Sequence, residues 1–294
     1  TDRAIGWLNE APADRPFLFR VSYLAPHTPT LPARPWHSMY ADRKWNWDLS
    51  TEAILRSRPR YELDDKGRAN FALLSSAERC QTRASYYGLV SEIDYHVGRL
   101  VAALRDTGLY DNTVIVFTSD HGYLLGEYGQ YNKSVFYDAV TRVPCILCGP
   151  GIGSGTRSDF TQQIDLGPTL LDIAALPSDN SFRGESVFED RYERDHVLGE
   201  IARKRHNRIQ RRAWVRTPRY SLDWTHQVDG ATPAASREGA GKLFDVHDAP
   251  AGRRNLFFDP AHRGTIEKMK NVFRKHLAQD LRPMQIGANG GTSE

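Results

Sequence analysis

A short apolar segment that breaks abruptly into polar residues constrains this sequence more than any other feature. Val114–Phe117 is a run of β-branched and aromatic residues, and the turn-like Asp111-Asn112-Thr113 precedes it. Such a run is typical of a strand that is buried on both faces. It continues as Thr118-Ser119-Asp120-His121-Gly122. Because open parallel sheets bind ligands outside the carboxyl ends of their strands, we expect chemistry at this strand end.

The residues that follow the first strand indicate a metal ion and an anion. Asp120 and His121 are adjacent and can both ligate a divalent cation. Lys133 comes later, before a second apolar run at Cys145–Cys148, and can return to neutralise a bound oxyanion. An Asp-His-Gly sequence by itself is more typical of a turn than of a metal site. The motifs around it therefore have to distinguish these two interpretations.

Composition and charge exclude several classes of protein. The chain has 294 residues, enough for one large α/β domain or for a domain with an appendage. Its net charge of +3 is too small to indicate a nucleic-acid partner. It contains no run of apolar residues long enough for a membrane-spanning helix. The three cysteines form no disulfide framework, and we interpret two of them, Cys145 and Cys148, as small buried residues.

Four motifs in a fixed order resemble those of a known family. They are Thr118–Gly122, the Leu-Gly-Glu-x-Gly sequence at 125–129, Lys133, and Arg142-Val143-Pro144. This combination resembles the type I, formylglycine-dependent sulfatases of the alkaline phosphatase superfamily, over nearly the whole chain. The resemblance implies an α/β sandwich of a mostly parallel sheet between helices, plus a small C-terminal antiparallel sheet with a helix. It also implies that Asp120 and His121 are metal ligands and that Lys133 contacts the sulfate group.

A histidine between two prolines is the other candidate site residue. Pro16–Tyr23 reads as a strand, and it ends in Ala25-Pro26-His27-Thr28-Pro29. The prolines fix φ on both sides of His27 and would hold its ring in place, although the same residue suits an ordinary surface loop. The resemblance implies that His27 contacts the sulfate ester and protonates the leaving group. The family often carries histidine where this chain has Tyr128.

Periodicity predicts the remaining elements and a division into parts. Apolar residues at steps of three and four predict helices over 1–10, 79–105, 162–176 and 264–281. The helix at 79–105 leads directly to the Val114 strand, which favours a crossover connection and a parallel sheet. Beyond residue 194, short strands joined by turns favour an antiparallel sheet. We therefore expect a portion of a catalytic domain at 1–194, a small α+β subdomain at 195–284 and a disordered tail at 285–294.

Two segments admit more than one interpretation. The stretch from Thr30 to Asp65, rich in Pro, Trp and Arg, reads either as a surface insertion packed by its own aromatic residues or as a wall facing a sulfated sugar. The six cations at 203, 204, 205, 208, 211 and 212 suit a solvated hairpin, with a sulfated glycan or a nucleic acid as the alternatives. Of these, we favour the hairpin and expect no nucleic-acid partner.

The resemblance also shows what this sequence lacks. The family makes its formylglycine nucleophile from a Cys/Ser-x-Pro-x-Arg motif, and no such motif occurs in the 294 residues. No strand that ends in paired aspartates precedes His27, and the family uses such a pair for its other metal ligands. We expect a preceding N-terminal part to supply both. For the cofactor we expect a divalent metal, calcium by preference, with magnesium or manganese as alternatives.

The expected function is therefore that of a segment of a hydrolase for sulfate esters, which include sulfated carbohydrates. One alternative is a phosphonate monoester or phosphodiester hydrolase of the same superfamily, because tetrahedral oxyanions of similar size require similar donors. Another alternative is a non-catalytic remnant. Many members of the family are exported to the periplasm, the lysosome or the cell exterior.

Overall fold

The structure is a computed structural model whose described residues form two compact units. It describes residues 1–12, 14–47, 66–178, 182–189, 192–205, 208–228, 241–248 and 254–280. One unit is formed by the described residues up to Gly155 and the other by those from Thr156 onward. The expected tail at 285–294 and the second half of the insertion, 48–65, lie outside the described residues. The expected domain boundary at residue 194 stays a prediction.

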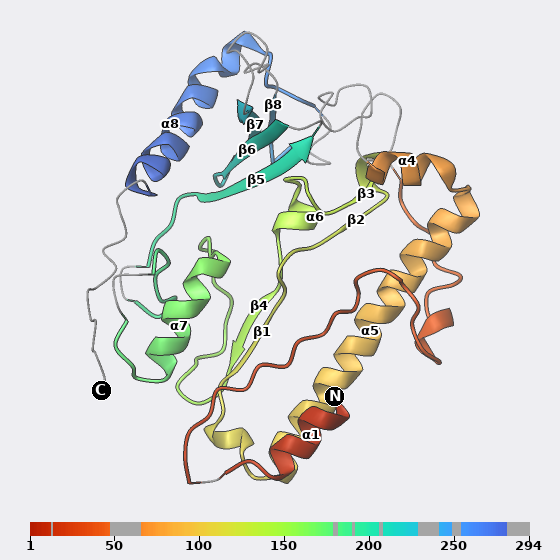
Figure 1. Cartoon of the computed structure of the whole chain (residues 1–294), viewed down its shortest axis with the longest axis vertical. Coiled ribbons are helices and arrows are strands. Elements are labelled where there is room, and N and C mark those ends of the chain that lie inside the picture. Colours follow the sequence, from red (N-terminus) through yellow and green to blue (C-terminus); the bar gives the residue numbers. More distant parts are fainter. Residues whose placement is uncertain are drawn as a thin grey trace, which may run out of the picture. The chain divides into compact units, whose positions relative to one another are not determined.

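The first unit contains a long helix, on which other segments of the unit pack (Figure 1). Helix α5 (Ser76–Asp106) begins at a capping box, in which the Ser75 hydroxyl accepts from the Glu78 backbone N–H and the Glu78 carboxylate accepts from the Ser75 N–H. Beyond its C-terminal end, Gly108 has a φ of +72°. The helix predicted at 79–105 is thus confirmed. The described residues of this unit also form the helices α1 (Asp2–Asn9), α4 (Lys66–Leu73) and α6 (Asp138–Thr141) and the 3₁₀ turns η1 (Trp36–Ser38), η3 (Tyr110–Asn112) and η4 (Glu127–Gly129).

The segment at 17–23 lies extended but forms no strand among the described residues, so the predicted strand is wrong. Its side chains alternate, with Phe17 and Phe19 half-buried and Leu18 exposed. The half-buried rings pack on a small core of α1 and α5 that contains Leu8 and Leu104. The alternation arises from this packing on helices, whereas a strand also needs a hydrogen-bonded neighbour.

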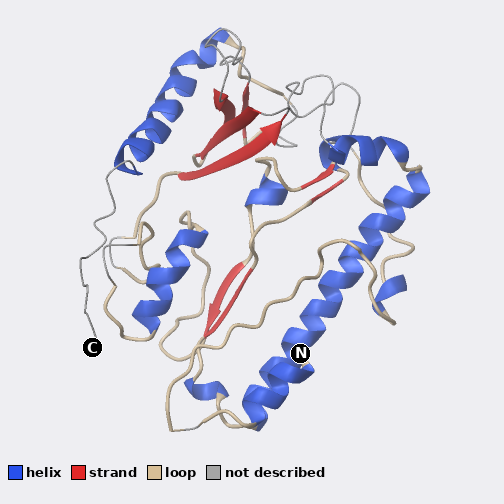
Figure 2. Cartoon of the chain, in the orientation of Figure 1, coloured by secondary structure: helices blue, strands red, loops and turns tan. Residues whose placement is uncertain are grey.

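The ladder that carries the first motif is antiparallel (Figure 2). Strand β1 (Ile115–Thr118) pairs with β4 (Cys145–Cys148), with Ile115 opposite Cys148 and Thr118 opposite Cys145. Both strands were predicted, but the parallel pairing expected for β1 is not the one observed. The chain leaves β1 at Thr118 and returns to β4 at the same end of the ladder, as antiparallel pairing requires.

Strand β4 is more exposed than its apolar sequence suggests. Cys145 and Cys148 are both exposed, which corrects their interpretation as buried residues. Ile146, between them, is 55% exposed. Within the described residues, β4 pairs with β1 alone, and a ladder of two strands leaves much of its surface uncovered.

A small hairpin lies between the two strands of this ladder in the sequence. Strands β2 (Leu124–Leu125) and β3 (Tyr131–Asn132) pair through two residue positions, Leu124 with Asn132 and Leu125 with Tyr131. The turn between them contains Gly126 at φ +103° and Tyr128 at φ +57°. A side chain on Gly126 would lie 2.5 Å from the Trp47 ring, so the turn requires glycine there.

The second unit contains the predicted antiparallel sheet and final helix. Its strands run in the order β5 (Val197–Arg205), β6 (Arg208–Arg216), β7 (Tyr220–Val228) and β8 (Gly241–Asp245), all antiparallel. Helix α8 (Arg263–Asp280) buries Ile266, Met269 and Phe273 in the core that the sheet shares with it. The unit also contains η5 (Gln163–Asp165), α7 (Leu166–Ile173) and η6 (Pro260–His262). The α/β class with a small C-terminal antiparallel sheet and a helix is confirmed.

The basic run at 203–212 belongs to the hairpin of β5 and β6. Arg212, at its end, is 5% exposed and forms an ion pair with Asp223, which also accepts from Lys242 at 3.0 Å. The Nη1 atom of Arg211 lies 3.7 Å from the Oε1 atom of Glu200, so these two side chains form an ion pair. The two last cations of the run thus have partners inside the sheet. Among the described residues no helix is long and apolar enough to cross a membrane.

A buried carboxylate directly before α7 joins several segments of the second unit. Asp165 is 1% exposed, accepts from both terminal nitrogens of Arg194 at 2.7 and 2.8 Å, and accepts from the Tyr192 hydroxyl at 3.0 Å. Burial raises the pKa of Asp165, but the hydrogen bonds from Arg194 and from two backbone N–H groups outweigh it, so that its pKa lies below the usual value.

We predict that Asp165→Asn lowers the free energy of unfolding of this unit by about 3–5 kcal/mol at pH 7, because it leaves the Arg194 charge buried and unpaired. Since folding depresses the pKa of Asp165, its contribution is present above about pH 4 and is lost as the pH falls through the lower, folded-state pKa. Urea unfolding at pH 7 and pH 3 measures both effects. The control Asp159→Asn, in an exposed pair with Arg157, should cost less than about 1 kcal/mol.

Candidate functional site

Hydrogen bonds hold the polar residues after β1 against the chain that leads to β4. The Thr118 hydroxyl donates to the Pro144 carbonyl at 2.9 Å, and the Gly122 N–H donates to the Val140 carbonyl in α6 at 2.7 Å. A side chain at Gly122 would lie 2.0 Å from the Ala139 carbonyl oxygen, so only glycine allows this approach. The segment 119–122 therefore has a fixed position relative to α6.

Asp120 and His121 present two candidate ligand atoms side by side. One Asp120 oxygen accepts from the His121 backbone N–H at 2.8 Å. The ring Nδ1 of His121 lies 2.8 Å from the Gly122 carbonyl oxygen, which can only accept, so Nδ1 carries the proton. In the neutral form of the ring the Nε2 atom then has its lone pair available, and this atom lies 3.4 Å from the other Asp120 oxygen.

Lys133 belongs to the same group of charges. It follows β3 directly, and its positive charge is among the causes that lower the pKa of Asp120. Burial raises this pKa, while the His121 backbone hydrogen bond and the charges of His121 and Lys133 lower it by more. The structure thus brings together three of the four residues that the sequence singled out.

The donor set fits part of a metal site. A carboxylate oxygen and an imidazole nitrogen 3.4 Å apart can both reach one divalent cation at about 2.0–2.6 Å. The described residues contain no group of three His, Cys, Asp or Glu side chains that could hold a metal. Asp120 and His121 therefore fit such an ion as two of its ligands.

His27 is exposed, and its local contacts do not join it to this group. Its Nδ1 lies 2.8 Å from the Thr28 carbonyl oxygen, and its backbone N–H donates to the Leu24 carbonyl at 3.0 Å. Its approach to Asp120 and Lys133 stays a prediction.

Two tyrosines near Asp120 were not anticipated. The rings of Tyr86 in α5 and Tyr123 after the Asp-His-Gly motif stack with centroids 6.3 Å apart and an angle of 21°. Burial raises the pKa of Tyr86, and the charges of Tyr123, Tyr87 and Asp120 add to the effect. The sequence did offer one signal for Tyr123, since this residue lies only two positions after His121. Tyr128, where the family often has histidine, is buried and stacks on Tyr137 at 3.9 Å.

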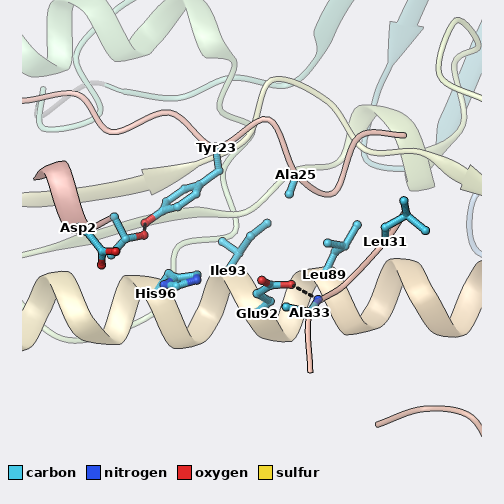
Figure 3. A pocket seen from close by; sticks show the side chains of 10 residues that line it. Asp2, Tyr23, Ala25, Leu31, Ala33, Leu89, Glu92, Ile93 and His96 are labelled. Atoms are coloured by element: carbon cyan, nitrogen blue, oxygen red, sulfur yellow. Dashed lines mark hydrogen bonds between the residues drawn. The ribbon is translucent and has the colours of Figure 1, made fainter. Parts of the chain in front are cut away.

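A cavity of about 390 Å³ lies elsewhere in the first unit, between α5 and the segment at 23–33 (Figure 3). Glu92 and His96 of α5 project toward it, and Glu92 accepts from the Ala33 backbone N–H at 3.1 Å. None of the four predicted site residues lines this cavity. Its lining residues are Thr1, Asp2, Tyr23, Ala25, Leu31, Ala33, Leu89, Glu92, Ile93 and His96.

Comparison with known families supports the resemblance that the motifs suggested. Residues 1–176 match the family model described as sulfatase. Residues 126–279 match the model described as the C-terminal part of N-sulphoglucosamine sulphohydrolase.

Individual relatives extend over nearly the whole chain. An arylsulfatase of Clostridium perfringens is 24% identical over 289 residues, which are 94% of this chain and 56% of that protein. Among solved structures, a phosphonate monoester hydrolase from Silicibacter pomeroyi has a TM-score of 0.76 at 26% identity, covering 95% of this chain and 59% of its own. A protein solved with its substrate D-glucosamine-2-N,6-O-disulfate has a TM-score of 0.75 at 20% identity, covering 96% and 69%. The chain thus spans little more than half the length of the arylsulfatase and of the phosphonate monoester hydrolase.

We predict that Gly122→Ala lowers the free energy of unfolding of the first unit by about 1–3 kcal/mol, because the added methyl group collides with the Ala139 carbonyl. Thermal unfolding followed by circular dichroism measures the change. Gly98→Ala is the control, since a side chain at this position of α5 meets nothing within 4 Å. A melting temperature equal to that of Gly98→Ala would contradict the close approach.

Proposed function

Because this chain belongs to the sulfatase family, we propose that it is the part of a sulfate-ester hydrolase that supplies two metal ligands and the cationic contact to the sulfate group. The observation that carries the proposal is the grouping of Asp120, His121 and Lys133 beside one end of the β1–β4 ladder. The relatives are longer than this chain, so the activity of the whole protein is part of the proposal.

The proposed roles follow from the charges of these side chains. Lys133 would hold a sulfate oxygen and stabilise the negative charge that develops as the ester bond breaks. His27 would protonate the leaving oxygen, as its exposed ring and neighbouring prolines allow. Family membership implies a divalent metal, and Asp120 and His121 would be two of its ligands. When bound, such a cation polarises the oxyanion.

We propose calcium as the metal, because a carboxylate oxygen is the type of ligand that this hard cation prefers. The imidazole of His121 is also compatible with manganese. A formylglycine made in a preceding part of the polypeptide would be the nucleophile.

For the substrate we propose the sulfate ester of a carbohydrate, since a structural relative was solved with a disulfated glucosamine as its substrate. A phosphonate monoester is the second candidate, favoured by the similarity to the Silicibacter hydrolase at 26% identity. In the protein that also carries the nucleophile, the ratio of kcat/KM for an aryl sulfate to that for an aryl phosphonate monoester distinguishes them. A ratio above one supports the sulfatase and a ratio below one supports the alternative.

In the protein that also carries the nucleophile, we predict that Lys133→Met costs about 2–4 kcal/mol in binding of both the substrate and inorganic sulfate, because it removes a cation from the oxyanion site. Steady-state kinetics with sulfate as an inhibitor measures both values. Lys268→Met, on the exposed face of α8, is the matched control. Unchanged values for both ligands would remove Lys133 from the site.

We predict that the polypeptide of these 294 residues shows no turnover of an aryl sulfate with calcium or manganese. It lacks the nucleophile motif, and water attacks the ester far more slowly than a covalent catalyst does. Release of the phenol, measured over several equivalents, tests this. Multiple turnovers that Asp120→Ala abolishes would contradict the proposed covalent mechanism.

A further inference from the structure

The guanidinium of Arg83 joins helix α5 to the β2–β3 hairpin. Its side chain is 7% exposed. Its Nε and Nη2 atoms donate to the Leu125 carbonyl at 3.0 and 2.8 Å, and Nη1 donates to the Asn46 carbonyl at 3.1 Å. The ring centroid of Trp47 lies 4.1 Å from the guanidinium carbon. One buried cation thus fixes three segments of the chain.

The carboxylate of Glu127 completes this arrangement. One of its oxygens accepts from Arg83 at 2.5 Å, and the other accepts from the Leu125 backbone N–H at 2.6 Å. Both backbone groups of Leu125 are therefore held, its carbonyl by Arg83 and its N–H by Glu127. Charge-assisted hydrogen bonds of this kind are about twice as strong as neutral ones.

The hairpin needs such support because it is short. Its two strands pair at two positions, and isolated two-stranded hairpins are marginally stable in water. His121 lies shortly before β2, and Lys133 follows β3 directly. The place of the hairpin therefore sets where the Lys133 backbone lies relative to His121.

We propose that Arg83, together with Glu127, is a positioning residue that fixes the hairpin 124–132 and thereby holds Lys133 at the anion site. This inference rests on the proposed function, in which Lys133 contacts the sulfate group. Lysine cannot replace Arg83, because a single ammonium lacks the planar fork that reaches Leu125, Asn46 and Glu127 together and stacks on Trp47.

Hydrogen exchange of the 294-residue chain tests the positioning without any ligand. In Arg83→Lys and in the milder Glu127→Gln, we expect amides of 124–133 to exchange roughly tenfold faster, because hydrogen bonds to a charged group are lost. Arg194→Lys, which disturbs the buried pair with Asp165, is the matched control and should accelerate exchange around Asp165 but not at 124–133. Unchanged exchange at 124–133 in both hairpin variants would overturn the inference.

A double-mutant cycle on the affinity for inorganic sulfate tests the link to Lys133. In calorimetric titrations, Arg83→Lys should weaken sulfate binding about tenfold in the otherwise unchanged chain and not at all in the Lys133→Met background. A general loss of stability would weaken binding equally in both backgrounds, and this result would overturn the role assigned to Arg83. If the unchanged chain binds no sulfate, the proposed function fails in this chain, while hydrogen exchange still decides whether Arg83 fixes the hairpin.

Discussion

Because β1 and β4 pair antiparallel, the chain between Thr118 and Cys145 starts and ends at the same end of their ladder. The position of the candidate site depends on this constraint. This connecting segment contains the candidate metal ligands Asp120 and His121 as well as Lys133. It closes through the hydrogen bond from Gly122 to Val140, which needs a residue without a side chain at position 122. The segment that carries the functional groups is therefore held in place by a backbone contact.

Largely buried arginine side chains pair with carboxylates of other segments at three places among the described residues. Arg83 pairs with Glu127, Arg194 with Asp165, and Arg212 with Asp223. In each pair the carboxylate is less than a third exposed and accepts more than one hydrogen bond or ion pair. A planar guanidinium with five donors suits this task, because it can bind a carboxylate and carbonyl oxygens at the same time.

The helices and the C-terminal sheet could be predicted because their signals are local. The period of the apolar residues in α5 and α8 is read within one segment. The strand predicted at 16–23 was wrong, because alternation of apolar and polar residues indicates an extended chain but does not supply a partner strand. The pairing direction of β1 also depended on where a distant segment returned.

The candidate site could likewise be predicted only where its residues lie close together in the sequence. The order of the motifs identified Asp120, His121 and Lys133, which lie close together in the chain. No sequence pattern singled out Arg83, because its pairing with Glu127 spans 44 positions that no local pattern connects.

The exposed thiols of β4 have a practical consequence for handling the protein. Cys145 and Cys148 form no disulfide within the described residues and lie at the surface, where a disulfide can form between two molecules. Without a reductant, such bonds would produce covalent dimers that imitate a biological assembly. The oligomeric state of this chain therefore has to be measured with its cysteines reduced or replaced.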